Sequence, residues 1–130
     1  WLSSANVSCG AHAGSETDIR QAIRLCKLHQ VAVGAHPSYP DRANFGRLAL
    51  DIPLPQLKDS LCQQLDFFLK IAQEEGVTLS HLKAHGALYN IAAQQGPTAC
   101  EVQATAVNIG SQLRRGGFQR FQNSFLDFGN

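Results

Sequence analysis

The sequence lacks an excess of charge of either sign. Eleven Lys and Arg side chains are balanced by ten Asp and Glu side chains among 130 residues, a formal net charge of +1. It also lacks any long run of like charges. Nucleic acids and anionic membranes are bound by clustered positive charge, so we expect neither as a partner.

Long apolar segments are missing as well. No apolar run approaches the roughly 18–20 residues that span a bilayer, and no charged start precedes an apolar block, so no secretory signal is predicted. The chain begins at Trp1 rather than at methionine, and we expect that a preceding segment has been removed. With 44% apolar and 16% charged residues, the composition predicts one globular domain.

No C-x-x-C pair occurs among the four cysteines, which are widely separated: Cys9, Cys26, Cys62 and Cys100. Cys26 and Cys62 fall on or beside the apolar faces of expected helices, where a free cysteine acts as a small hydrophobe. The spacing favours a reduced, cytoplasmic protein over a disulfide framework.

Strand-like and helix-like patterns alternate along the chain. Strands are expected at residues 2–9, 31–36 and 77–85, and a long loop follows the second of them. Ser15, with Asp18 three residues later, predicts a capped helix that carries the apolar residues Ile19, Ala22, Ile23 and Cys26. Pro55 is expected at the first position of a second helix, which ends at Gly76 and carries Leu57, Leu61, Leu65, Phe68, Leu69 and Ala72.

A short helix is expected over residues 87–95, and another after Pro97 through Ala99, Val102, Ala106 and Leu113. The alternation predicts an α/β fold in which βα units surround a parallel sheet. We place the domain at residues 1–108. Residues 109–130 contain four phenylalanines without a regular period and are left unassigned.

Three histidines share one kind of position. His12, His36 and His85 each lie beside glycine or alanine, at or just past the carboxyl end of an expected strand. In parallel α/β folds ligands and catalytic groups gather at this edge, so the three imidazoles could bind a metal ion or share acid–base chemistry. The alternative is that glycine beside histidine reflects turn formation alone.

Other side chains near these strand ends fit a polar site. Lys83 lies two residues before His85 and is expected on the same face of the strand, and Asp41 lies in the loop after His36. His29, near a helix C-terminus, and His81, within a strand, are expected to be structural or surface residues.

Three stretches resemble one family. "SANVSCGAHAGS", "VAVGAHPSYPDRANFGR" and "HLKAHGALYN" occur in the order and spacing of the LamB/YcsF family, from about Ser3 to about Asn108. The resemblance implies a distorted β/α barrel like that of polysaccharide deacetylases and related glycoside-processing enzymes. It also implies that the chain is an A subunit of bacterial 5-oxoprolinase. With two partner subunits of the B and C types, that enzyme opens the lactam of 5-oxo-L-proline to L-glutamate at the expense of ATP.

The resemblance also implies roles for individual residues. His12, His36 and His85 are the first candidates for catalytic residues, and the same three are the candidate ligands of a divalent metal ion. Lys83 is expected to bind phosphate or an oxyanion, and Asp41 is the fifth candidate. ATP is the implied cofactor, with a metal ion left open.

The chain departs from the family pattern in several places. The family's first strand, which resembles "DLNCDLGE", is absent, Ser15 replaces an aspartate, and Ala84 replaces a proline. We therefore expect an incomplete barrel that is inactive alone and stable only as an assembly, for example a homo-oligomer. Two alternatives remain open: a metal-dependent carbohydrate deacetylase, and a truncated family member that serves only as an interaction or vestigial protein.

Overall fold

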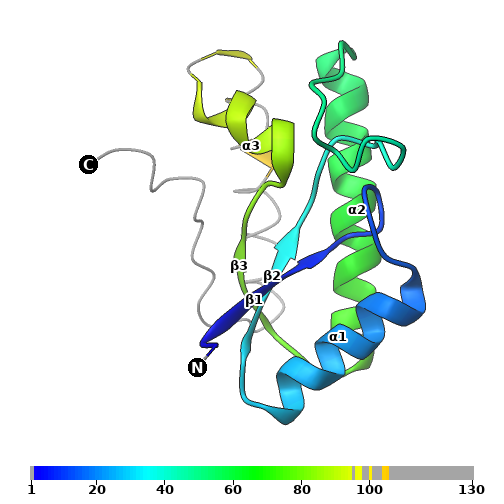
Figure 1. Cartoon of the computed structure of the whole chain (residues 1–130), viewed down its shortest axis with the longest axis vertical. Helices are drawn as coiled ribbons and strands as arrows, with labels where there is room; N and C mark the ends of the chain where they lie inside the picture. The colour runs from blue at the N-terminus through cyan, green and yellow to red at the C-terminus, as the bar shows by residue number, and fades with distance from the viewer. Residues whose placement is uncertain (1, 95, 98–99, 101–103, 106–130) are drawn as a thin grey trace.

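Strands and helices alternate along the chain as the sequence predicts (Figure 1). The computed structural model describes residues 2–94, 96–97, 100 and 104–105. The strands are β1 (Ser4–Ser8), β2 (Ala32–His36) and β3 (Leu79–Leu82), and the helices are α1 (Glu16–Leu28), α2 (Leu54–Glu74) and α3 (Gly86–Ala93). The residues that predict a helix after Pro97 (Ala99, Val102, Ala106 and Leu113) and the segment 109–130 lie outside the described residues.

The three strands form one parallel sheet in the order β1-β2-β3. β1 pairs with β2 from Ser4 opposite Ala32 to Ser8 opposite His36. The pairing of β2 with β3 shifts register between Val33 and Gly34. α1 and α2 lie on one side of this sheet (Figure 1), where each connects one strand to the next, as parallel pairing requires. The fold is therefore α/β with parallel βα units.

Helix α1 begins where its capping residues predict. The Ser15 hydroxyl accepts a hydrogen bond from the Asp18 amide, and the Asp18 carboxylate accepts one from the Ser15 amide. This reciprocal pair satisfies two amides that the first helical turn leaves without partners. Ile19, Ile23 and Cys26 are buried against the sheet and α2.

Helix α2 starts one residue earlier than predicted. Its first residue is Leu54, so Pro55 occupies the second position rather than the first. Proline is tolerated there because the first amides of a helix have no acceptor within it. The helix ends at Glu74, and Gly76 takes a φ of +65° just after it, as the glycine stop predicts. Its buried residues are Leu57, Leu61, Gln64, Leu65, Phe68, Ile71 and Ala72.

The sheet has one apolar and one polar face at the level of β2. Val33 and Ala35 are buried in the core, whereas the ring of His81 lies over Gly34 on the opposite face. His81 Nε2 donates a hydrogen bond to Asn6 Oδ1, 2.8 Å away on β1. His81 thus has the structural role that its place within a strand predicts.

None of the four cysteines, all of which lie among the described residues, forms a disulfide bond. Cys26 is buried and Cys62 half-buried, as their places on the helices predict. Burial also raises the pKa of the Cys9 thiol to about 12. None of the helices in the described part of the chain is long and apolar enough to cross a membrane.

Candidate active site

The three candidate histidines meet at the carboxyl edge of the sheet. His36 is the last residue of β2, His85 precedes α3, and His12 lies in the loop between β1 and α1. The ring centroids of His12 and His85 are 3.9 Å apart with the rings stacked. The centroid of His36 lies 4.9 Å from that of His85 and 5.9 Å from that of His12. We call these three residues the histidine cluster.

His12 is the most buried member of the histidine cluster, with 3% of its surface exposed. Its Nδ1 lies 2.9 Å from the hydroxyl of Ser38. Burial, and then the positive charges that His85, His36 and Arg42 can carry, lower its pKa from 6.5 to about 4. At neutral pH His12 is therefore an uncharged imidazole with one nitrogen lone pair, as a general base requires.

His36 and His85 form a hydrogen-bonded pair between two carbonyl groups. His36 Nδ1 donates to the Lys83 carbonyl at 2.7 Å, and His85 Nε2 donates to the Phe45 carbonyl at 2.9 Å. The inner nitrogens, His36 Nε2 and His85 Nδ1, are 3.0 Å apart.

These three hydrogen bonds require three protons, because the carbonyl groups only accept. Two neutral imidazoles carry two protons, so the complete set forms only when the pair holds one extra proton. Burial lowers the pKa of His36 and opposes that uptake. The geometry of the pair therefore provides one position, between the two inner nitrogens, for a single extra proton.

The same contacts bear on the predicted metal site. A histidine ligand needs a free nitrogen lone pair that points at the ion. The outer nitrogens, His36 Nδ1 and His85 Nε2, contact carbonyl groups, as the second nitrogen of a metal-bound histidine commonly does, and the inner nitrogens face each other. Within the described residues, no group of three or more His, Cys, Asp or Glu side chains is arranged to hold a metal ion. The ligand set of the predicted metal site therefore remains a prediction.

Lys83 lies beside the histidine cluster. It directly follows β3 and shares with His36, Tyr89 and Asn90 the lining of a pocket of about 400 Å³. Its ammonium group stands 5.8 Å from the centre of the Tyr89 ring. The structure therefore brings the predicted cation to the pocket that His36 also lines.

Asp41 is buried in the loop after β2. One carboxylate oxygen accepts hydrogen bonds from the amide and the side chain of Asn44. The other oxygen is buried and has no hydrogen-bond partner among the described residues. These contacts stabilise the loop itself, and the predicted catalytic role of Asp41 remains a prediction.

The loop that contains Asp41 also covers the histidine cluster. The ring of Phe45 meets those of His12 and His85 edge-on, with centroids 5.2 Å apart in both cases. The Gly46 carbonyl accepts a hydrogen bond from the Ala87 amide. A Cβ atom on Gly86 would overlap that carbonyl group, so glycine allows the loop to approach α3 closely.

Three residues that contact the histidines or hold their neighbours were not predicted from the sequence. These are Ser38, Phe45 and Gln64. The sequence pattern around Gln64 could have indicated its role, because Gln64 is the one polar residue among the buried positions of α2. A buried side-chain amide needs hydrogen-bond partners, so a glutamine within an apolar stripe indicates a polar contact beneath the helix.

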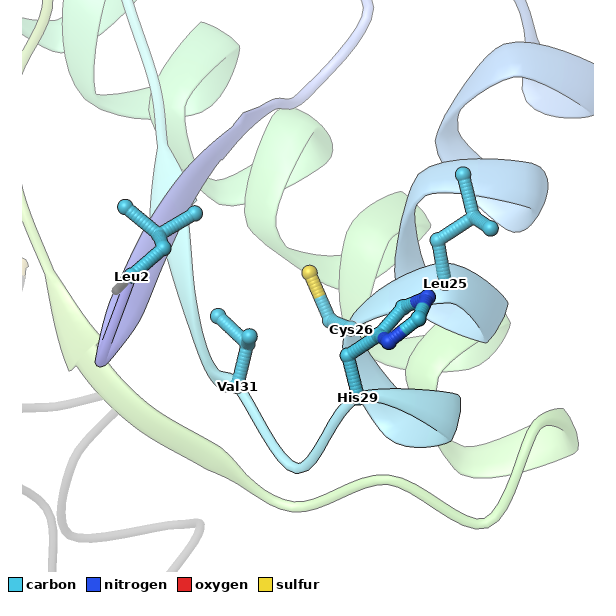
Figure 2. Close-up of a pocket in the computed structure, with 5 residues that line it drawn as sticks. All are labelled: Leu2, Leu25, Cys26, His29 and Val31. Atoms are coloured by element: carbon cyan, nitrogen blue, oxygen red, sulfur yellow. The ribbon is translucent and has the colours of Figure 1, made fainter.

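A second, apolar pocket lies at the other end of the sheet. It has a volume of about 410 Å³ and is lined by Leu2, Leu25, Cys26, His29 and Val31 (Figure 2). Leu2 precedes β1 and Val31 precedes β2, so this pocket opens at the amino edge. His29 follows the last residue of α1, as predicted, and belongs to this edge and not to the histidine cluster.

Comparisons with known proteins agree with the sequence motifs. The sequence matches the LamB/YcsF family over residues 1–120. The A subunit of 5-oxoprolinase from Histophilus somni is 43% identical over 113 residues, which cover 87% of this chain and 46% of that protein. The protein of the same name from Chloroflexus aggregans is 46% identical over 113 residues, covering 87% and 45%.

A solved structure matches the fold. The crystal structure of a lactam utilization protein from Thermus thermophilus superposes with a TM-score of 0.80 at 32% identity. The match covers 93% of this chain and 54% of that one. The chain thus spans about half the length of the curated relatives and of the solved structure that it matches.

Proposed function

Because the chain belongs to the LamB/YcsF family, we propose that it contributes part of the A subunit of an ATP-dependent 5-oxoprolinase. In this proposal the enzyme uses water to open the lactam of 5-oxo-L-proline, giving L-glutamate. The relatives that are named as A subunits of 5-oxoprolinase support the assignment. The observation that carries it is the convergence of three histidines from three successive strand ends.

His12 suits the role of general base. Water attacks an amide carbonyl only slowly unless a base removes a proton as the new C–O bond forms. His12 is uncharged at neutral pH because its pKa is lowered to about 4. We assign to it the proton that the attacking water loses.

The histidine pair, His36 and His85, suits the later proton transfer. When the lactam C–N bond breaks, the ring nitrogen leaves as an amine and needs a proton. The pair shares a position for one extra proton between two carbonyl groups. We assign to it the donation of that proton to the leaving nitrogen.

Lys83 suits the negative charge that develops on the carbonyl oxygen. Its side chain is exposed and lines the same pocket as His36. A cation placed near the developing oxyanion lowers the barrier for acyl transfer. ATP, when bound, supplies activation of the otherwise unreactive amide carbonyl, and no step is assigned to a metal ion.

The wider assembly belongs to the same proposal. Three parallel strands with helices on one side suit a segment of a distorted β/α barrel, because further strands would close the sheet. We propose that two further subunits, of the B and C types, complete the enzyme. Four cysteines that form no disulfide bond suit a cytoplasmic location, and a homo-oligomer is a further way to cover the sheet edges.

The test replaces single histidines in the complete enzyme assembled with its partner subunits. We expect His12→Gln and His85→Ala to lower the rate of glutamate release by about 100-fold or more, the usual contribution of a general acid or base. His29→Ala is the matched control and should leave the rate unchanged, because His29 lies at the amino edge of the sheet. The isolated chain is expected to be inactive.

Two outcomes would contradict the proposal. The first is full ring-opening activity in the His85→Ala enzyme. The second is one tightly bound divalent ion per chain that is lost on His12→Gln and His85→Ala but not on His29→Ala. That pattern would favour the metal-dependent deacetylase instead, so metal content is measured on the same preparations.

A further inference from the structure

The hydroxyl of Ser38 lies between two partners whose hydrogen-bonding roles are known. Ser38 is fully buried, and its Oγ is 2.8 Å from the Tyr39 carbonyl and 2.9 Å from His12 Nδ1. A carbonyl group only accepts, so the single hydroxyl proton of Ser38 is donated to Tyr39. The Ser38 oxygen therefore accepts a hydrogen bond, and His12 Nδ1 must carry the proton that is donated to it.

The position of this proton determines which nitrogen of His12 is basic. An uncharged imidazole carries its proton on one nitrogen and a lone pair on the other. With the proton on Nδ1, the lone pair is on Nε2. Without a partner for Nδ1, either nitrogen of His12 could carry the proton.

Ser38 is itself held in place by helix α2. Its amide donates to Gln64 Oε1 at 3.0 Å, and Gln64 Nε2 donates to the Ser38 carbonyl at 2.8 Å. The second hydrogen of that amide nitrogen is donated to the Ser60 hydroxyl at 3.1 Å. Gln64 is 7% exposed, so these bonds are shielded from water. Both groups of the glutamine side chain are used, and its orientation is fixed by them.

We propose that Ser38 and Gln64 are positioning residues that fix the tautomer of His12, with Nδ1 protonated and Nε2 available as the base. Gln64 holds the backbone of Ser38 from both sides, and the Ser38 hydroxyl passes that order on to the imidazole. The catalytic consequence rests on the proposed function, whereas the tautomer itself does not. Ser38 and Gln64 orient His12 much as a third residue orients the base in hydrolases that use a nucleophile and a histidine.

The first experiment measures the tautomer directly. Nitrogen-15 labelled histidine gives long-range proton–nitrogen NMR correlations that distinguish a protonated Nδ1 from a protonated Nε2, and His12→Gln identifies the His12 signals. In the full chain at neutral pH, His12 is expected to show a protonated Nδ1. Ser38→Ala removes the acceptor and should shift the tautomer ratio by about threefold to tenfold, as expected for one net hydrogen bond.

Ser60→Ala is the matched control. It removes one partner of Gln64 but leaves both hydrogen bonds between Gln64 and Ser38, so the His12 signals should not change. The proposal is overturned if wild-type His12 has its proton on Nε2, or if Ser38→Ala leaves the tautomer ratio as it was. The first point needs only the wild-type spectrum and the His12→Gln spectrum that assigns it, so it does not depend on whether Ser38→Ala folds.

The second experiment tests the catalytic consequence in the complete enzyme. Ser38→Ala is expected to lower kcat by up to the same threefold to tenfold factor as the tautomer ratio, and to change KM less than twofold, because the substrate does not need Ser38 for binding. Loss of activity in every enzyme including the wild type would refute the proposed function and leave the NMR result standing. A fixed tautomer in the wild type, with kcat unchanged in Ser38→Ala, would refute the catalytic role alone.

Discussion

Gly34 and the ring of His81 are in close contact on the polar face of the sheet. Because of this contact, the effect of Gly34→Ala on the free energy of unfolding should change sign when the His81 ring is removed. A Cβ atom on Gly34 would overlap three atoms of the His81 ring. The backbone at Gly34 does not have the positive φ that excludes alanine. Gly34→Ala is therefore disfavoured by the ring alone and not by the backbone.

The cost can be worked from the contacts that the methyl group would break. The ring must move, which breaks the bond from His81 Nε2 to Asn6 Oδ1, worth about 0.5–1.5 kcal/mol. Overpacking adds about 1–3 kcal/mol. We expect Gly34→Ala to lower the free energy of unfolding by about 1.5–4.5 kcal/mol. In a chain that already carries His81→Ala, the space is open and Gly34→Ala should raise it by about 0.4–1 kcal/mol, because alanine restricts the unfolded chain.

Urea unfolding followed by circular dichroism measures all four chains of this cycle. Gly96→Ala is the control, since a Cβ atom there would meet nothing within 4 Å, and it should raise the free energy of unfolding by no more than about 0.4–1 kcal/mol, with or without His81. If Gly34→Ala is equally destabilising with and without His81, the ring is not the cause and the reasoning fails.

Two further predictions concern protonation. Lowering the pH from 6.5 to about 4 should reduce the free energy of unfolding by up to about 3 kcal/mol through His12, since its folded pKa of about 4 lies below 6.5 and the unfolded chain binds the proton first. The contribution of His12 to stability is fully present above pH 6.5. Urea unfolding at pH 7 and 4.5 should therefore show a smaller loss of unfolding free energy in His12→Gln than in the wild type. Equal losses in the two chains would contradict this origin. Cys100 is exposed and should react quickly with a thiol reagent at pH 8, whereas Cys9 is buried with its pKa raised to about 12 and should react only as the chain unfolds. Comparing reaction rates in Cys9→Ser and Cys100→Ser checks this, and a fast-reacting Cys9 would show that the core opens locally.

Much of the fold could be predicted because its signals are local. The cap of α1 depends on Ser15 and Asp18, three residues apart, and the end of α2 on Gly76. Both are set by the backbone conformation of a few neighbouring residues. The start of α2 was misplaced by one residue, because Pro55 is acceptable at either of the first two positions.

The proximity of the histidines could also be predicted, but not their contacts. Each follows a strand, and the carboxyl ends of parallel strands share one edge, so His12, His36 and His85 had to lie near one another. Residue type alone left open whether they bind a metal ion or move protons. The carbonyl groups of Phe45 and Lys83 orient the imidazoles of His85 and His36 through their outer nitrogens, and this arrangement is compatible with either role.

By itself, the sequence determined the order of strands and helices, their caps and the edge of the sheet where the histidines gather, because each depends on residues within a few positions of one another. Only the tertiary structure decided which nitrogen of His12 is basic and why Gly34 is glycine. Ser38 meets a histidine 26 residues before it and a glutamine 26 residues after it. Contacts at such separations depend on the register of strands and the rotation of helices, to which hydrophobic periodicity is insensitive.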